Sequence, residues 1–107
     1  MDFTGQVAVV TGAGGGIGTA LVKKFTDLGA KVALLDVKEE FCRRTVEKLQ
    51  LDEDRVLCLA ADISDEQAVK ETIARIMDRF GRIDILINSA GISGPSARTE
   101  DYSFNDV

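Results

Sequence analysis

The amino-acid sequence predicts an α/β fold built on half of a doubly wound parallel sheet. Short apolar runs alternate with longer segments of helical periodicity between residues 7 and 91. Such alternation is typical of parallel strands joined by helices in right-handed crossovers. A glycine-rich loop follows the first run, and an aspartate ends each of the next two runs. Ligands of these folds bind at the carboxyl ends of the strands, so we expect the functional site there.

The composition narrows the class of protein. The 107 residues suffice for one domain, and 45% apolar with 29% charged residues is typical of a soluble globular protein. The net charge of −5 argues against nucleic-acid or anionic-membrane partners, which require clustered basic residues. No apolar run is long enough to span a bilayer, and the N-terminus lacks the basic region of a signal peptide. We therefore expect a cytoplasmic protein.

Histidine and cysteine usage limits the chemistry. The chain contains no histidine, which removes His-based acid–base catalysis and most zinc sites, and we expect no metal. The two cysteines, Cys42 and Cys58, do not form a CxxC pair. We interpret them as structural thiols in a helix and a strand.

The first predicted strand and helix flank the glycine-rich loop. Residues 7–11 (VAVVT) form a β-branched run of the kind found in buried parallel strands. The helix after the loop is expected to end at Gly29, since glycine is common just beyond a helix C-terminus. The inward face of this helix is predicted to carry Ile17, Leu21, Phe25 and Leu28.

The second strand is predicted at residues 31–36 (KVALLD) and the third at residues 56–62 (VLCLAAD). Residues 38–50 between them have helical periodicity, and LDEDR forms a polar turn before the third strand. The intervening helix is predicted to direct inward Phe41, Thr45 or Val46, and Leu49.

A capping box predicts the start of the third helix, with Ser64 as the cap and Gln67 reaching back to it. Gly81 is expected to end this helix. Its inward face is predicted to carry Val69, Ile73, Ile76 and Phe80. Residues 83–91 then supply the fourth strand and a turn of small residues.

Residues 11–18 (TGAGGGIG) place five glycines in eight positions. The spacing differs from GxGxxG and fits TGxxxGIG, with Gly12 at a tight turn after the first strand. We expect Gly16 to let the backbone approach a pyrophosphate, Ile17 to dock the helix in the core, and Gly18 to let helix and strand pack closely. The N–H groups at the start of the helix favour phosphate binding.

Asp36 ends the second strand, 18 residues after Gly18. In dinucleotide-binding folds, an acid at about this spacing accepts hydrogen bonds from the adenosine ribose. A carboxylate there also repels a 2′-phosphate, which favours NAD over NADP. Gly15 and Val37 are not basic and so provide no partner for a 2′-phosphate. Lys38 lies close enough in the sequence to bind such a phosphate, which would favour NADP.

These motifs resemble those of the short-chain dehydrogenase/reductase family, and the resemblance extends over the whole chain. They are TGAGGGIG at 11–18, Asp36, ADI at 61–63 and NSAG at 88–91. The resemblance implies a Rossmann-type fold whose strands lie in the order 3-2-1-4, with the adenine along residues 62–63 and the cofactor ribose beside the 88–91 turn. The expected NAD-binding residues are Gly12, Gly14, Gly15, Gly16, Ile17, Gly18, Asp36, Val37, Asp62, Ile63, Asn88, Ser89, Ala90 and Gly91.

Two departures from the family pattern bear on function. Ser89 stands where the family's NNAG turn has its second Asn, and offers one donor instead of an amide's two. The family's catalytic Ser and its Tyr-xxx-Lys pair come later than these residues, and Tyr102 is followed four positions on by Asp106 instead of Lys. A carboxylate there would raise the pKa of the Tyr instead of lowering it. We therefore expect no catalytic residue in this chain.

The leading interpretation is that residues 1–107 are a partial NAD(P)-binding domain without its catalytic half. The resemblance implies a homo-oligomeric parent enzyme that interconverts a secondary alcohol and a ketone by hydride transfer with NAD. One alternative is a short, non-catalytic dinucleotide-binding or interaction module, and a second is an S-adenosylmethionine-dependent methyltransferase. The fourth strand would be an open edge on which Ile85 and Ile87 remain apolar, so we expect the isolated chain to self-associate.

Overall fold

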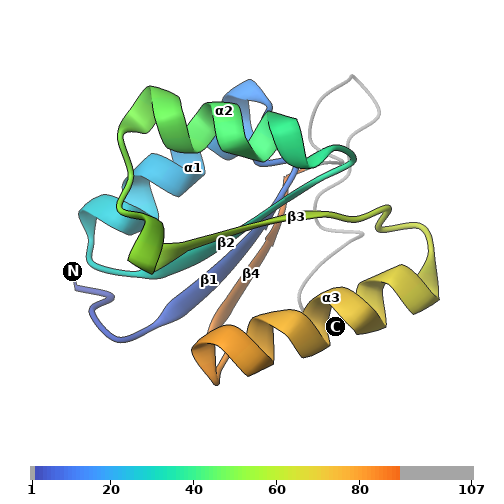
Figure 1. Ribbon diagram of the computed structural model, residues 1–107. Helices are drawn as coiled ribbons and strands as arrows, with labels where there is room; N and C mark the ends of the chain where they lie inside the picture. The colour runs from blue at the N-terminus through green and yellow to red at the C-terminus, as the bar shows by residue number, and fades with distance from the viewer. Residues whose placement is uncertain (1, 90–107) are drawn as a thin grey trace.

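The computed structural model describes residues 2–89, which form a four-stranded parallel sheet covered by helices on both faces (Figure 1). The strand order is β3-β2-β1-β4, which confirms the predicted 3-2-1-4 arrangement. The strands are β1 (Val7–Thr11), β2 (Lys31–Asp36), β3 (Val56–Ala60) and β4 (Ile85–Asn88). The helices are α1 (Gly16–Asp27), α2 (Glu39–Leu49) and α3 (Glu66–Phe80), with a 3-10 turn η1 (Glu53–Arg55).

The sheet separates two apolar cores because successive side chains of a strand point to opposite faces. Ala8 and Val10 of β1 face α1 and α2, where they pack with Val22 and Val46. The intervening β1 residues face α3, where they pack with Ile76. In Figure 1, α1 and α2 cover one face of the sheet and α3 lies across the other. Both faces of β1 and β2 are therefore buried, as expected for central parallel strands.

The predicted inward face of α1 is partly wrong. Ile17 was expected in the core, but its side chain is 47% exposed and borders the glycine-rich loop. The buried face instead consists of Gly18, Val22, Phe25 and Thr26. At Gly18 the helix approaches the backbone of Gly12 so closely that there is no room for a side chain. The predicted end is confirmed, since Gly29 follows the helix cap with φ +97°.

The cap of α3 also differs from the prediction. Asp65, and not Ser64, is the N-cap, and its carboxylate accepts from the N–H groups of Gln67 and Ala68 at 3.0 and 3.3 Å. Ser64 is engaged elsewhere, because its N–H and hydroxyl both donate to Asp62. Within the helix, Ile76 is buried as predicted, whereas Ile73 is 42% exposed.

Element ends deviate by a few residues from the predicted ranges. Helix α2 lacks the first and last residues of the predicted 38–50 helix, and Gln50 caps it in the left-handed region with φ +54°. Strand β3 stops two residues before Asp62, and β4 takes up residues 85–88 of the 83–91 segment that was predicted to hold a strand and a turn. Within residues 2–89, no helix is both long and apolar enough to cross a membrane.

Strand β4 is the edge of the described sheet. It pairs with β1 alone among the described strands, and each of its four residues is half-buried. The predicted open edge is therefore present within residues 2–89. Its consequence, self-association, stays a prediction.

Candidate functional site

The glycine-rich loop makes a tight connection between β1 and α1. Gly12 turns the chain with φ +64°, a conformation that side chains disfavour, and the N–H of Gly15 donates to the Gly12 carbonyl at 3.0 Å. A Cβ on Gly18 would lie 2.1 Å from the Gly12 carbonyl oxygen. The start of the helix therefore packs directly on the turn, as the TGxxxGIG spacing predicted.

Ala13 anchors the loop to three surrounding elements. Its N–H donates to the Leu35 carbonyl of β2 at 3.0 Å. Its carbonyl accepts from the hydroxyls of Thr45 on α2 at 2.9 Å and Thr19 on α1 at 3.1 Å. This anchor was not predicted from the sequence. The inward position predicted for Thr45 or Val46 was a signal for it, because a buried hydroxyl requires a partner.

The N-terminus of α1 faces open space beside this loop. Its N-cap, Gly15, has no side chain to cap the first N–H groups, and the first turn holds no acidic residue. A Cβ on Gly16 would have no neighbouring atom within 4 Å. These N–H groups and the partial positive charge of the helix end can therefore bind an anionic group such as a phosphate.

Asp36 lies at the end of β2 against the same loop. Its Oδ2 accepts from the Gly14 N–H at 2.9 Å, and its Oδ1 accepts from the Val37 N–H at 2.7 Å. A Cβ on Gly14 would come within 2.7 Å of the Phe41 Cβ and 3.0 Å of the Asp36 carboxylate. Gly14 therefore lets α2 and Asp36 approach the loop, whereas Gly15 and Gly16 leave space open in front of it.

A cleft of about 460 Å³ joins the loop, the end of β2 and the turn after β4. It is lined by Gly12, Gly15, Gly16, Ile17, Gly18, Asp36, Val37 and Ser89. A smaller cavity of about 70 Å³ continues along the ends of β2 and β3. It is lined by Thr11, Gly12, Leu35, Asp36, Val37, Ala61, Asp62 and Ile63. The predicted residues from four separate segments of the chain thus meet in one region.

The walls of this region combine acidic and exposed apolar side chains. Val37 and Ile63 are large apolar residues that remain exposed. The Asp62 carboxylate accepts from the Ser64 hydroxyl at 2.6 Å and from its N–H at 2.9 Å, and these hydrogen bonds, the hydroxyl's first, lower the pKa of Asp62. Asp62 therefore stays ionised near neutral pH. Such walls suit a flat apolar ring beside hydroxyl groups that donate hydrogen bonds.

The end of β4 closes the cleft on the side of β1. The Thr11 hydroxyl donates to Oδ1 of Asn88 at 2.8 Å, and the buried Ser89 hydroxyl donates to the Thr11 carbonyl. Ser89, the departure from the family's NNAG turn, thus links the end of β4 to that of β1. Ala90 and Gly91 lie outside the described residues, as do Tyr102 and Asp106.

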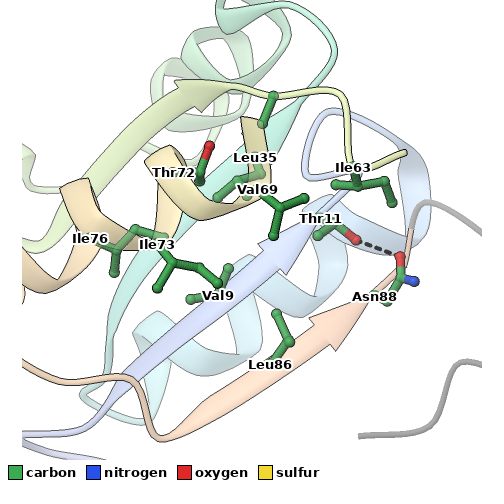
Figure 2. Close-up of a pocket in the computed structure, with 11 residues that line it drawn as sticks. Val9, Thr11, Leu35, Ile63, Val69, Thr72, Ile73, Ile76, Leu86 and Asn88 are labelled. Carbon is green, nitrogen blue, oxygen red and sulfur yellow. Dashed lines mark hydrogen bonds between the residues drawn. The ribbon is translucent and has the colours of Figure 1, made fainter. Parts of the chain in front are cut away.

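An apolar cavity of about 320 Å³ lies next to this region, between α3 and the sheet (Figure 2). Its lining residues are Val9, Thr11, Leu35, Ala61, Ile63, Val69, Thr72, Ile73, Ile76, Leu86 and Asn88. Figure 2 shows the side chains of Val69 and Ile73 on α3 facing those of the strands beneath. Its polar lining residues, Thr11, Thr72 and Asn88, include no ionisable group. Among residues 2–89, no three His, Cys, Asp or Glu side chains are grouped so as to hold a metal ion.

Known proteins resemble this chain in sequence and in structure. A family profile described as short chain dehydrogenase matches residues 6–107. The 15-hydroxyprostaglandin dehydrogenase (NAD(+)) of Homo sapiens is 38% identical over 96 residues, which cover 87% of this chain and 36% of that protein.

Many solved structures share the fold, among them two with a bound nicotinamide dinucleotide. One is 3-ketoacyl-(acyl-carrier-protein) reductase from Brucella melitensis complexed with NADH, with a TM-score of 0.72, 36% identity, and coverage of 79% of this chain and 34% of that chain. The other is a short chain dehydrogenase/reductase from Burkholderia phymatum in complex with NAD, with a TM-score of 0.73, 36% identity, and coverage of 80% and 31%. The chain spans less than half of the length of such curated relatives: 41% of the Rattus norvegicus 15-hydroxyprostaglandin dehydrogenase and 33% of (+)-borneol dehydrogenase 2 of Salvia officinalis.

Proposed function

Because this chain belongs to the short-chain dehydrogenase/reductase family, we propose that it forms the NAD-binding part of an oxidoreductase that interconverts a secondary alcohol and a ketone. The observation that carries the proposal is a single cleft that is lined both by the uncapped N-terminus of α1 and by Asp36. Phosphate and ribose are adjacent in a dinucleotide. The helix N-terminus suits the phosphate, and the carboxylate suits the ribose hydroxyls. NAD, when bound, supplies the hydride acceptor.

We assign the walls of the cleft to parts of the cofactor by their chemistry. The α1 N-terminus at Gly15 and Gly16 would hold the pyrophosphate, because its N–H groups are free of a side-chain cap. Asp36 would accept from the ribose hydroxyls. The adenine would lie between Val37 and the Asp62–Ile63 pair, where apolar side chains are exposed.

The turn after β4 would adjoin the second ribose. Asn88 and Ser89 are held there by their hydrogen bonds with Thr11. Ala90 and Gly91 continue this turn in the sequence, and we propose that they line the same part of the site.

Charge at the end of β2 supports NAD over NADP. Asp36 would repel a 2′-phosphate, and neither Gly15 nor Val37 offsets it with a positive charge. The basic side chains of Lys38 and Arg44 lie against the Phe41 ring, with Lys38 Nζ at 5.8 Å and Arg44 Cζ at 5.5 Å from its centroid. Lys38 remains the one feature that favours NADP.

We further propose that these residues bind the cofactor without catalysing the reaction. Within residues 2–89, the polar side chains that line the cleft and the smaller cavity are those of Thr11, Asp36, Asp62 and Ser89, with no tyrosine or lysine among them. Tyr102 is followed by Asp106 at the fourth position. The complete enzyme would act as a cytoplasmic homo-oligomer. Family membership argues against the methyltransferase alternative.

Calorimetric titration with NAD, NADP and S-adenosylmethionine tests the proposal. We expect NAD to bind most tightly. Asp36→Asn keeps an oxygen that can accept from Gly14 but removes the charge, so NAD affinity should fall about tenfold, as for a lost charged hydrogen bond, and the preference over NADP should narrow.

The matched control is Asp78→Asn, an exposed acid on α3 away from the cleft, which should change neither affinity. Preferential binding of S-adenosylmethionine, or no binding of either nicotinamide dinucleotide, would overturn the proposal.

A further inference from the structure

The two cysteines of the chain meet in the core between α2 and the sheet. Cys42 on α2 is 0% exposed, Cys58 on β3 is 8% exposed, and both are free thiols in the same apolar cluster. The Cys42 Sγ donates to the Leu34 carbonyl at 3.3 Å, and Leu34 is the residue that pairs with Cys58 across β2 and β3. The Cys42 Sγ also lies 4.0 Å from the carbonyl oxygen of Leu59, the residue after Cys58 in β3, so the two cysteines are neighbours between α2 and the sheet.

The two thiols have different surroundings. Cys58 lies 3.9 Å from a guanidinium nitrogen of Arg43, which Glu53 holds in place through hydrogen bonds of 2.8 and 3.1 Å. The interaction with Cys42, together with the charge of Arg43, lowers the pKa of Cys58, whereas the interaction with Cys58 and burial raise the pKa of Cys42. The more exposed sulfur is thus the one whose thiolate is favoured.

We propose that Cys42 and Cys58 form a reversible intrachain disulfide when the protein meets a peroxide. The Cys58 sulfur attacks one peroxide oxygen, the O–O bond breaks, and a sulfenic acid forms as the other oxygen leaves and takes a proton. The Cys42 sulfur then attacks the Cys58 sulfur, the S–O bond breaks, and the hydroxyl leaves as water with the Cys42 proton. Two thiols lose two electrons, and hydrogen peroxide is reduced to two molecules of water.

The bridge would connect α2 covalently to β3 beside the cleft. Phe41, the neighbour of Cys42, packs against the position of Gly14 and borders Asp36. Oxidation would therefore fix the helix that supports this end of the glycine-rich loop. The proposal stands on the two thiols and does not depend on which cofactor binds.

Titration of the folded, reduced protein with hydrogen peroxide tests the proposal. We expect the linked Cys42–Cys58 peptide after digestion without reductant, an intact mass lower by two hydrogen atoms, and recovery of both thiols with dithiothreitol. Far-UV circular dichroism should stay unchanged, showing that the bridge forms in the folded chain.

The variants Cys42→Ser and Cys58→Ser are the controls, and neither should lose the mass of two hydrogen atoms. Wild-type protein decides the question even where a variant folds poorly. Recovery of Cys42 and Cys58 as free thiols, or as separately oxidised residues in folded protein, would overturn the proposal.

Discussion

The glycines between residues 12 and 18 differ in what surrounds them. A side chain at Gly18 would collide with the Gly12 carbonyl, and one at Gly14 would collide with Phe41. A side chain at Gly16 would meet no protein atom within 4 Å. The first two positions therefore contribute to packing, and Gly16 leaves space in which a ligand can approach the backbone.

Replacing two of these glycines by alanine separates folding from binding. Gly18→Ala puts a Cβ 2.1 Å from a backbone oxygen, so we expect a loss of about 2 kcal/mol in the free energy of unfolding and loss of NAD binding. Gly16→Ala adds a better helix former in open space, so stability should be kept or raised while NAD affinity falls. Urea unfolding and calorimetry measure the two effects. Equal destabilisation by both variants would contradict this division.

Residue types fixed by local backbone geometry were predictable from the sequence. Gly12, Gly18 and Gly29 were assigned correctly because turns and close packing leave glycine as the fitting residue. The exposure of Ile17 was not predicted, because its helical phase depends on how closely Gly18 brings α1 to the turn. The anchoring of Ala13 also escaped prediction, since its hydroxyl partner Thr45 comes from a distant element.

At the scale of elements, the order and type of the strands and helices follow from periodicity. Each predicted strand exists because a β-branched or apolar run is bounded by glycine or polar residues. The start of α3 was misassigned because Ser64 and Asp65 are adjacent and both are good caps. Asp62 decides between them by accepting from the Ser64 N–H and hydroxyl, a local contact between residues two positions apart that the capping-box pattern does not include.

Alanine substitutions at these two adjacent residues test the corrected cap. Asp65→Ala removes the acceptor for two N–H groups of α3, so we expect a loss of about 1 kcal/mol in the free energy of unfolding. Ser64→Ala removes a hydrogen bond between exposed groups and should change stability by no more than about 0.5 kcal/mol. Chemical denaturation of both variants measures the difference. The reverse order would restore Ser64 as the cap.

At the scale of the whole molecule, the two faces of the sheet are covered unequally. Helices α1 and α2 cover one face, whereas α3 alone lies on the other and leaves an apolar cavity of about 320 Å³ next to β4 (Figures 1 and 2). Ile63, Ile73 and Met77 remain exposed on this side. The open edge was predictable from strand order, but the cavity was not, since the predicted inward face of α3 placed Ile73 in the core.

Residues 1–107 on their own should self-associate through this face and the β4 edge. An edge strand presents unpaired N–H and C=O groups on its outer side, and these groups and an exposed apolar cavity both favour contact with a second chain. Ile73→Lys should weaken association at least about tenfold, because burying an isoleucine side chain contributes about 1.5–3 kcal/mol. Sedimentation velocity over a range of concentrations measures the strength of association.

The control is Ala74→Lys, which adds the same charge at the next residue of α3, at an exposed position outside the cavity lining. An equal effect of this variant would assign the change to charge. A monodisperse monomer at every concentration would contradict the prediction.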